Sequence, residues 1–217
     1  DRKGSRRKES FLLALEGARG VGKTATALQR ARTVHRLDDP GVRRIIEADP
    51  SLLTKGEPPV LIDEWQRLPW SWDVVRRAVD EDRSPGRFLL TGSAAPASPP
   101  THSGAGRIVS LRMRPMSLVE RGVGVPAVSL RDLLSGQRPA VSGTTDIDLT
   151  RYAHEIVSSG LPGLGGMPDR QIRSLLDSYL RHVVDRDIEE ARRPVRDSAA
   201  LTRWLTAYAG AVSTTSR

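Results

Sequence analysis

A glycine-rich loop that carries a single lysine constrains the fold of this chain more than any other feature. The stretch EGARGVGKTA at residues 16–25 directly follows the apolar run FLLAL at residues 11–15. Its residues 17–24 satisfy the spacing GxxxxGK[ST], and a helical pattern follows over residues 24–32. The motif requires a strand before the loop and a helix after it, and the sequence predicts both. We therefore expect a phosphate-binding loop at this place.

Each residue type in the loop has a chemical reason. Glycines allow successive backbone N–H groups to turn toward phosphate oxygens, and the helix that follows adds its positive end. A compact ammonium on a flexible stem, Lys23, reaches the β- and γ-phosphates, and the Thr24 hydroxyl ligates Mg²⁺. The residues predicted to bind the nucleotide here are Gly17, Ala18, Arg19, Gly20, Val21, Gly22, Lys23, Thr24 and Ala25.

An acidic pair ends a second apolar run. Residues 60–63, with the sequence VLID, predict a buried strand, and Glu64 follows Asp63 directly. Ligands of parallel sheets lie outside the carboxyl ends of the strands, so we expect Asp63 to face Mg²⁺ held at Thr24. Glu64 is placed to orient or deprotonate a water that attacks the γ-phosphate. An exposed acidic strand end is the alternative, and the nearby loop favours the metal site.

Two further positions complete the predicted site. The run LLTGS at residues 89–93 ends in small polar residues, and Thr91 or Ser93 is predicted to hydrogen-bond the γ-phosphate or the water. A simple turn after a strand is the alternative. Arg107 is predicted to stabilise charge on the transferred phosphoryl group, in the same chain or from a neighbouring one. The predicted catalytic residues are thus Lys23, Glu64 and Arg107.

Short apolar runs alternate with helical patterns through the first 120 residues. The predicted strands are residues 11–15, 33–37, 60–63, 87–91 and 107–113, and the predicted helices are residues 24–32, 43–48 and 73–82. This order requires crossover connections and therefore predicts an α/β fold with a mostly parallel sheet flanked by helices.

The rest of the chain has a different character. Residues 94–106 and 122–150 are rich in Pro, Gly and Ser, which predicts a loop and an irregular connector. Apolar residues from Ile172 to Ile188 fall on one face of a long helix, and a second helix follows around Leu201 to Tyr208. We therefore expect a P-loop domain over residues 1–121 and a helical part over residues 151–217.

Composition narrows the function classes. The 34 Lys and Arg exceed the 26 Asp and Glu, which gives a formal net charge of +8 and invites a nucleic-acid partner, with a solvated basic surface as the alternative. The absence of cysteine excludes disulfides and thiolate metal sites, and the four histidines show no ligand spacing. Apolar runs are too short for a membrane span, so we expect a cytoplasmic protein without membrane contact.

Several linked motifs occur in one order along the chain. They are GARGVGKT at residues 17–24, LDDP at 37–40, PVLIDEWQ at 59–66, PGRFLLTGS at 85–93, GR at 106–107 and RPMSL at 114–118. Together they resemble the AAA-type ATPases (AAA_14) that are paired with a DUF4143 domain, over most of residues 11–121. The segment SGLPG at residues 159–163 and the helix over residues 179–188 are similar to the start of the second domain of that family.

The resemblance implies an ATP-binding P-loop fold followed by a helical region with a winged-helix-like element. It also implies that Asp63 and Glu64 manage Mg²⁺ and water, that residues 91–93 are a sensor and that Arg107 is an arginine finger or sensor arginine. Chains of the family extend further at both ends, so this chain is expected to be cut at both. The second domain is then expected to be incomplete.

Three functions remain open at this stage. The first is an Mg-dependent ATPase that acts as a conformational switch. The second is a DNA-binding or toxin–antitoxin-like regulatory module with a structural or weakly active nucleotide site. A small-molecule kinase is the third, because P-loops serve both reactions, and the choice between ATP and GTP stays open. The expected partner is a nucleotide, while a protein partner, a second copy of the chain and nucleic acid stay open.

Overall fold

Five parallel strands form one sheet in the computed structural model, which describes residues 12–92, 108–187 and 197–212. The strands are β1 (Leu12–Glu16), β2 (Thr33–Arg36), β3 (Val60–Asp63), β4 (Phe88–Gly92) and β5 (Ile108–Arg112). Their order across the sheet is β2-β3-β4-β1-β5, and every neighbouring pair is parallel. The predicted parallel sheet is therefore confirmed.

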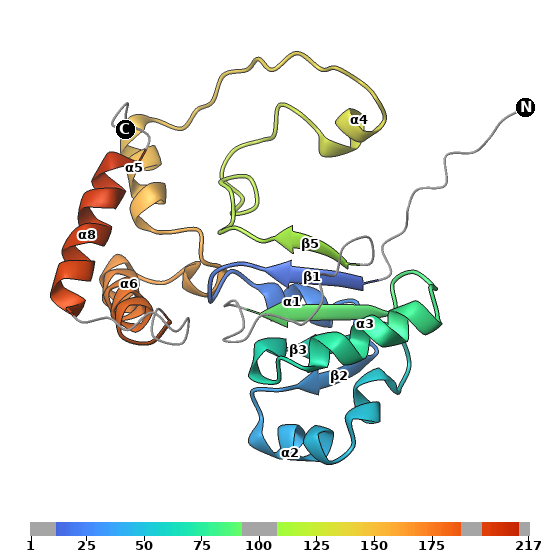
Figure 1. The fold of residues 1–217 in the computed structure, drawn as a ribbon. Helices are drawn as coiled ribbons and strands as arrows, with labels where there is room; N and C mark the ends of the chain where they lie inside the picture. Colours follow the sequence, from blue (N-terminus) through green and yellow to red (C-terminus); the bar gives the residue numbers. More distant parts are fainter. Residues whose placement is uncertain (1–11, 93–107, 188–196, 213–217) are drawn as a thin grey trace, which may run out of the picture.

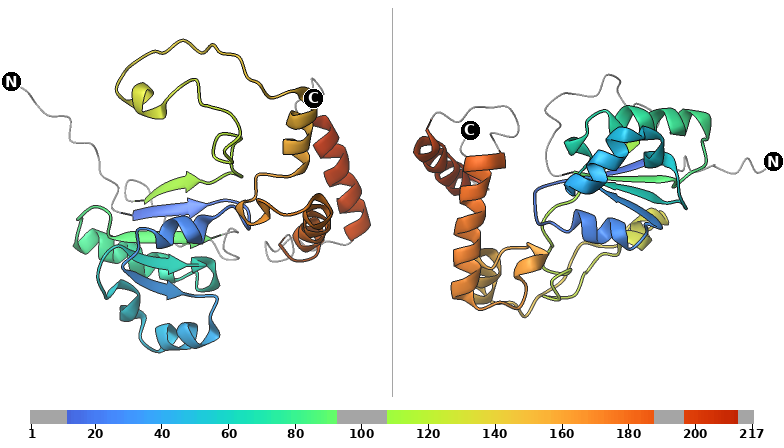
Figure 2. Two further views of the ribbon diagram at one scale, coloured as in Figure 1. Left: turned by 180° about the vertical axis from the view of Figure 1, so that it is seen from behind. Right: turned by 90° about the horizontal axis from the view of Figure 1, so that it is seen from below.

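Alternating side chains of the central strands divide the core into two layers. On β1, Leu12 and Ala14 belong to the larger cluster, whereas Leu15 belongs to the smaller one on the opposite face. The larger cluster lies under α2 (Pro40–Ala48), the 3-10 helix η1 (Pro50–Thr54) and α3 (Ser71–Glu81). The smaller cluster lies under α1 (Lys23–Leu28), so helices flank both faces (Figure 2).

The ends of the helices differ from those that periodicity predicts, by one or two residues in α3 and by more in α1 and α2. Helix α1 ends at Leu28 rather than at residue 32, because the Arg32 amide already donates to the Pro59 carbonyl, 2.9 Å away, where β2 begins to pair. Helix α2 begins at Pro40, three residues early. The Asp39 side chain caps it by accepting from the amides of Gly41 and Val42, and a proline suits the first helical position.

The helical part lies beyond the carboxyl ends of the strands, toward which the arrowheads point (Figure 1). It contains α5 (Leu149–Val157), the 3-10 turn η3 (Pro162–Leu164), α6 (Asp169–His182), the π-helical turn η4 (Val183–Asp187) and α8 (Ser198–Ala211). The long helix predicted over residues 172–188 is therefore corrected: it begins earlier, and its α-helical part ends at His182. The connector also contains a short helix, α4 (Leu130–Leu134).

A buried glutamate ties α5 to the segment after β5. Glu155 is only 4% exposed, and its carboxylate pairs with Arg151, 2.6 Å away, and with Arg121. The Arg121 guanidinium also donates to the Glu155 carbonyl at 2.7 Å. Two arginines offset the cost of burying this charge, since an unpaired buried carboxylate is strongly unfavourable.

Within the described part of the chain, no helix has both the length and the apolar character that crossing a bilayer requires.

The contrast between central and edge strands gives a stability prediction. Leu90 of β4 is fully buried, whereas Val109 of the edge strand β5 is 45% exposed. Leu90→Ala should lower the free energy of unfolding by about 3 kcal/mol through lost burial and a cavity. Val109→Ala should change it by less than about 1 kcal/mol. Urea unfolding followed by tryptophan fluorescence measures both, because three tryptophans lie in or against the larger core cluster. Equal losses for the two variants would contradict this description of the core.

Candidate functional site

The glycine loop runs from the end of β1 to the start of α1 and depends on positive backbone angles. Gly17, Gly20 and Gly22 have φ values of 146°, 80° and 95°. At Gly17 a Cβ would also lie 2.3 Å from the carbonyl oxygen of Met113, just after β5. The Met113 amide in turn donates to the Glu16 carbonyl at 2.7 Å. Glycine is thus required at residue 17 both by conformation and by the close approach of another backbone segment.

Lys23 folds back into this loop. Its Nζ donates to the carbonyl oxygens of Gly17 and Ala18, both at 2.8 Å, and the residue is only 5% exposed. A lysine ammonium has three N–H donors, so these two bonds fix its position and leave one donor for a ligand. Burial lowers the pKa of Lys23, and the charge of Arg19 lowers it further, while the carboxylates of Glu64 and Asp63 act in the opposite direction.

Asp63 joins three elements at the carboxyl end of the sheet. Its Oδ1 accepts from the hydroxyl of Thr24 in α1 at 2.8 Å and from the hydroxyl of Thr91 in β4. Asp63 and Thr91 are also register partners in neighbouring strands, and both are buried. The structure therefore brings together the two residues predicted to hold a metal, Thr24 and Asp63, and one residue of the predicted sensor.

Glu64 has a backbone conformation that is unusual for a residue with a side chain. Its φ of 55° and ψ of 45° place it in the left-handed region, at the start of the 3-10 turn η2 (Trp65–Arg67). The Gln66 side-chain amide donates to the Glu64 carboxylate. Strained residues of this kind cluster at functional sites. Sequence reasoning did not identify Gln66 as a site residue. The signal that could have found it is a side-chain amide two residues after the acidic pair.

Gly92 makes room for this turn at the end of β4. A Cβ on Gly92 would lie 2.6 Å from Oε1 of Gln66 and 3.0 Å from Nε1 of Trp65. The glycine therefore lets η2 pack against the strand end, which holds Gln66 close to Glu64.

The remaining predicted residues fall into two groups. Val21 is buried. The exposed residues, in the loop and at the start of α1, are Ala18, Arg19, Gly20 and Ala25. These exposed residues belong to the predicted site through their backbone and not through their side chains. Ser93 and Arg107 lie outside the described residues, as does the predicted loop over residues 94–106. The roles of all these residues in binding and catalysis stay predictions.

A family model described as an AAA domain (AAA_14) matches residues 9–121, more than half of the chain. The chain belongs to this AAA domain family. Membership places it among nucleotide-binding ATPase domains, and the match includes the glycine loop, the acidic strand end and the strand that carries Thr91. No curated protein matches the chain.

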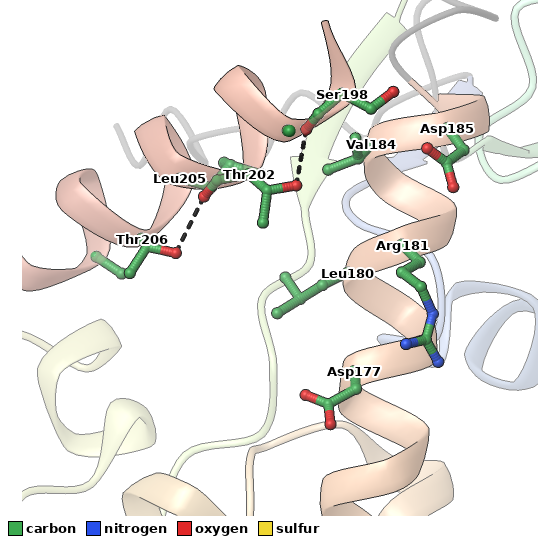
Figure 3. A pocket seen from close by; sticks show the side chains of 11 residues that line it. Asp177, Leu180, Arg181, Val184, Asp185, Ser198, Thr202, Leu205 and Thr206 are labelled. Atoms are coloured by element: carbon green, nitrogen blue, oxygen red, sulfur yellow. Dashed lines mark hydrogen bonds between the residues drawn. The ribbon is translucent and has the colours of Figure 1, made fainter.

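A groove of about 590 Å³ lies between α6 and α8 (Figure 3). Leu180, Val184 and Leu205 give it an apolar lining, and Asp177 and Arg181 lie along α6 beside it. None of the residues predicted for the nucleotide site lines this groove. This groove is therefore separate from the strand ends, where the structure brings Thr24, Asp63 and Thr91 together.

Substitution of Gly17 tests the geometry of the loop. Gly17→Ala should destabilise the domain by about 3 kcal/mol, because alanine is strained at this φ and its Cβ would meet the Met113 carbonyl. Gly210→Ala is the matched control, since a Cβ there meets no atom within 4 Å and the residue lies in α8. Thermal unfolding of both variants measures the difference. If Gly17→Ala were as stable as the control, the close approach of the loop to Met113 would be wrong.

Proposed function

We propose that this AAA domain binds ATP together with Mg²⁺, hydrolyses it slowly and acts as a conformational switch. The observation that carries the proposal is the cluster of Thr24, Asp63 and Thr91 at the strand ends, next to the buried ammonium of Lys23. Lys23 would contact the β- and γ-phosphates with the donor that the loop carbonyls leave unused. The backbone amides of the loop and the start of α1 would bind the remaining phosphate oxygens.

The donor set at Asp63 fits magnesium. Thr24 offers a hydroxyl oxygen and Asp63 a carboxylate oxygen, and Mg²⁺ prefers oxygen ligands from one or two side chains plus substrate phosphates. Among the described residues, no group of three or more His, Cys, Asp or Glu side chains could hold an ion by itself. When bound, the ion would neutralise charge on the phosphates. Thr24 and Asp63 would hold it, and Thr91 would fix the Asp63 carboxylate.

Glu64 is the proposed base. Its carboxylate would orient a water toward the γ-phosphate and accept the proton of that water, while Gln66 holds the carboxylate in place. The pair of adjacent acids favours hydrolysis over phosphoryl transfer to a small molecule. Arg107 would stabilise the charge that develops on the γ-phosphate.

The helical part would carry the response of the switch. It lies beyond the strand ends, where the nucleotide is proposed to bind (Figure 1). We propose that α5, α6 and α8 belong to a DUF4143-like helical region with a winged-helix-like element. A movement of these helices relative to the sheet would then report the nucleotide state.

Replacement of Lys23 tests nucleotide binding. Lys23→Ala should weaken ATP binding by about 100-fold, because it removes the charge-assisted hydrogen bonds to the phosphates. Lys55→Ala is the matched control: its side chain is 62% exposed and pairs only weakly with Asp49, so affinity should change by less than about twofold. Isothermal titration calorimetry with ATP and Mg²⁺ measures both affinities. Unchanged affinity of the Lys23 variant would remove the proposed site.

Replacement of Glu64 separates hydrolysis from binding. Glu64→Gln should lower the rate of ATP hydrolysis by about 100-fold or more while the affinity for ATP stays within about threefold, because the amide cannot accept a proton. Glu57→Gln, at a side chain that is 71% exposed, is the control. A phosphate-release assay with Mg²⁺ and with a chelator measures the rates. Full activity of the Glu64 variant, or full activity without a divalent ion, would contradict the proposed chemistry.

A further inference from the structure

A helix that lies more than a hundred residues away in sequence makes a hydrogen bond to the glycine loop. The Tyr179 hydroxyl of α6 donates to the carbonyl oxygen of Arg19, in the middle of the loop, at 3.1 Å. This bond links the helical part directly to the backbone that is proposed to bind phosphate.

Two apolar side chains add to the contact. A Cβ built on Gly20 would lie 3.9 Å from Cδ2 of Leu161, and one built on Gly22 would lie 3.7 Å from Cγ of Pro162. Leu161 and Pro162 therefore lie against the two inner glycines of the loop. Both distances are ordinary van der Waals contacts, so the two side chains pack against the loop without distorting it.

The segment that carries these side chains is itself fixed. The Gly160 carbonyl accepts from the Met116 amide at 2.7 Å, and a Cβ on Gly160 would lie only 2.5 Å from the Met116 carbonyl oxygen. Ser159 has a left-handed φ of 67°, which turns the chain from the end of α5 toward the loop. The segment thus packs tightly on the chain that leaves β5, and its position relative to the loop is defined by backbone contacts.

Three consecutive carbonyl groups of the loop have named donors. Lys23 holds those of Gly17 and Ala18, and Tyr179 holds that of Arg19. In a trans peptide the C=O and the following N–H point in opposite directions. The bond from Tyr179 therefore also fixes the direction of the Gly20 amide, one of the donors that the loop offers to phosphate.

We propose that Tyr179 is a positioning residue of the nucleotide site and that nucleotide binding is coupled to the helical part through its bond to Arg19. The inference rests on the proposed nucleotide site and names how that site communicates. If the bond from Tyr179 increases the affinity for nucleotide by some factor, bound nucleotide must stabilise the contact between α6 and the loop by the same factor. This follows because coupling between two sites is reciprocal.

The size of the effect follows from the type of bond. A single neutral hydrogen bond contributes about 1 kcal/mol, so loss of the Tyr179 hydroxyl should weaken ATP binding by about threefold to tenfold. This loss is much smaller than that expected for Lys23→Ala, because Lys23 is proposed to contact the phosphates directly.

The test compares Tyr179→Phe with Tyr152→Phe in the whole 217-residue chain. Tyr152 of α5 is 49% exposed and is a matched control for the loss of one hydroxyl. Calorimetry with ATP and Mg²⁺ gives the affinities, and hydrogen–deuterium exchange of residues 169–182 is measured with and without nucleotide. The melting temperature without nucleotide reports any general loss of stability.

We expect Tyr179→Phe to weaken ATP binding and Tyr152→Phe to leave it unchanged, with equal melting temperatures. ATP should slow exchange in α6 of the wild-type chain and of the Tyr152 variant, and this slowing should be lost in the Tyr179 variant. ATP binding with equal affinities in all three proteins and no change in α6 would overturn only the coupling. A wild-type chain that does not bind ATP would overturn the proposed function and the coupling with it.

Discussion

The buried carboxylate of Asp63 is the group on which the arrangement of the strand ends depends. Asp63 is only 5% exposed, and a buried carboxylate needs hydrogen-bond donors, which the hydroxyls of Thr24 and Thr91 supply to its Oδ1. These two donors come from different elements, so the bonds fix the start of α1 and the end of β4 relative to β3. The ammonium of Lys23 is close enough for its charge to interact with Asp63. One side chain thereby sets the relative positions of loop, helix and sheet.

Much of the sheet and of the loop follows from the sequence because local physics determines it. Residues 60–63 form the predicted strand without a shift, since an apolar run of this length is buried on both faces of a parallel sheet. The spacing of glycines and lysine also places the loop between a strand and a helix, as observed. Helix ends were harder to predict, because Asp39 and the pairing of Arg32 override periodicity.

The contacts that sequence reasoning missed join residues far apart in the chain. Nothing in the periodicity of α6 distinguishes Tyr179 from the apolar residues of the same helix, so its bond to the Arg19 carbonyl cannot be inferred from spacing. The same holds for Leu161 and Pro162, whose neighbours are defined only when the chain folds back from β5. Among the described residues of the helical part, few are buried, and Ile172 and Val184 are the buried apolar ones. The position of the helical part therefore depends on a small number of specific contacts. We expect it to unfold locally before the sheet does.

The strand order has a geometric consequence for the chemistry. Because β4 lies between β1 and β3, the origin of the glycine loop and the acidic strand tip are two interstrand spacings apart, roughly 10 Å. Backbone hydrogen bonding between the strands sets this distance, so it does not depend on the side chains that the strand ends carry. The end of β4 lies within this distance, and its Thr91 hydroxyl donates to the Asp63 carboxylate. Substitutions at the strand ends change the chemical groups at this edge of the sheet, whereas the hydrogen-bonded strands keep the same distance from one another.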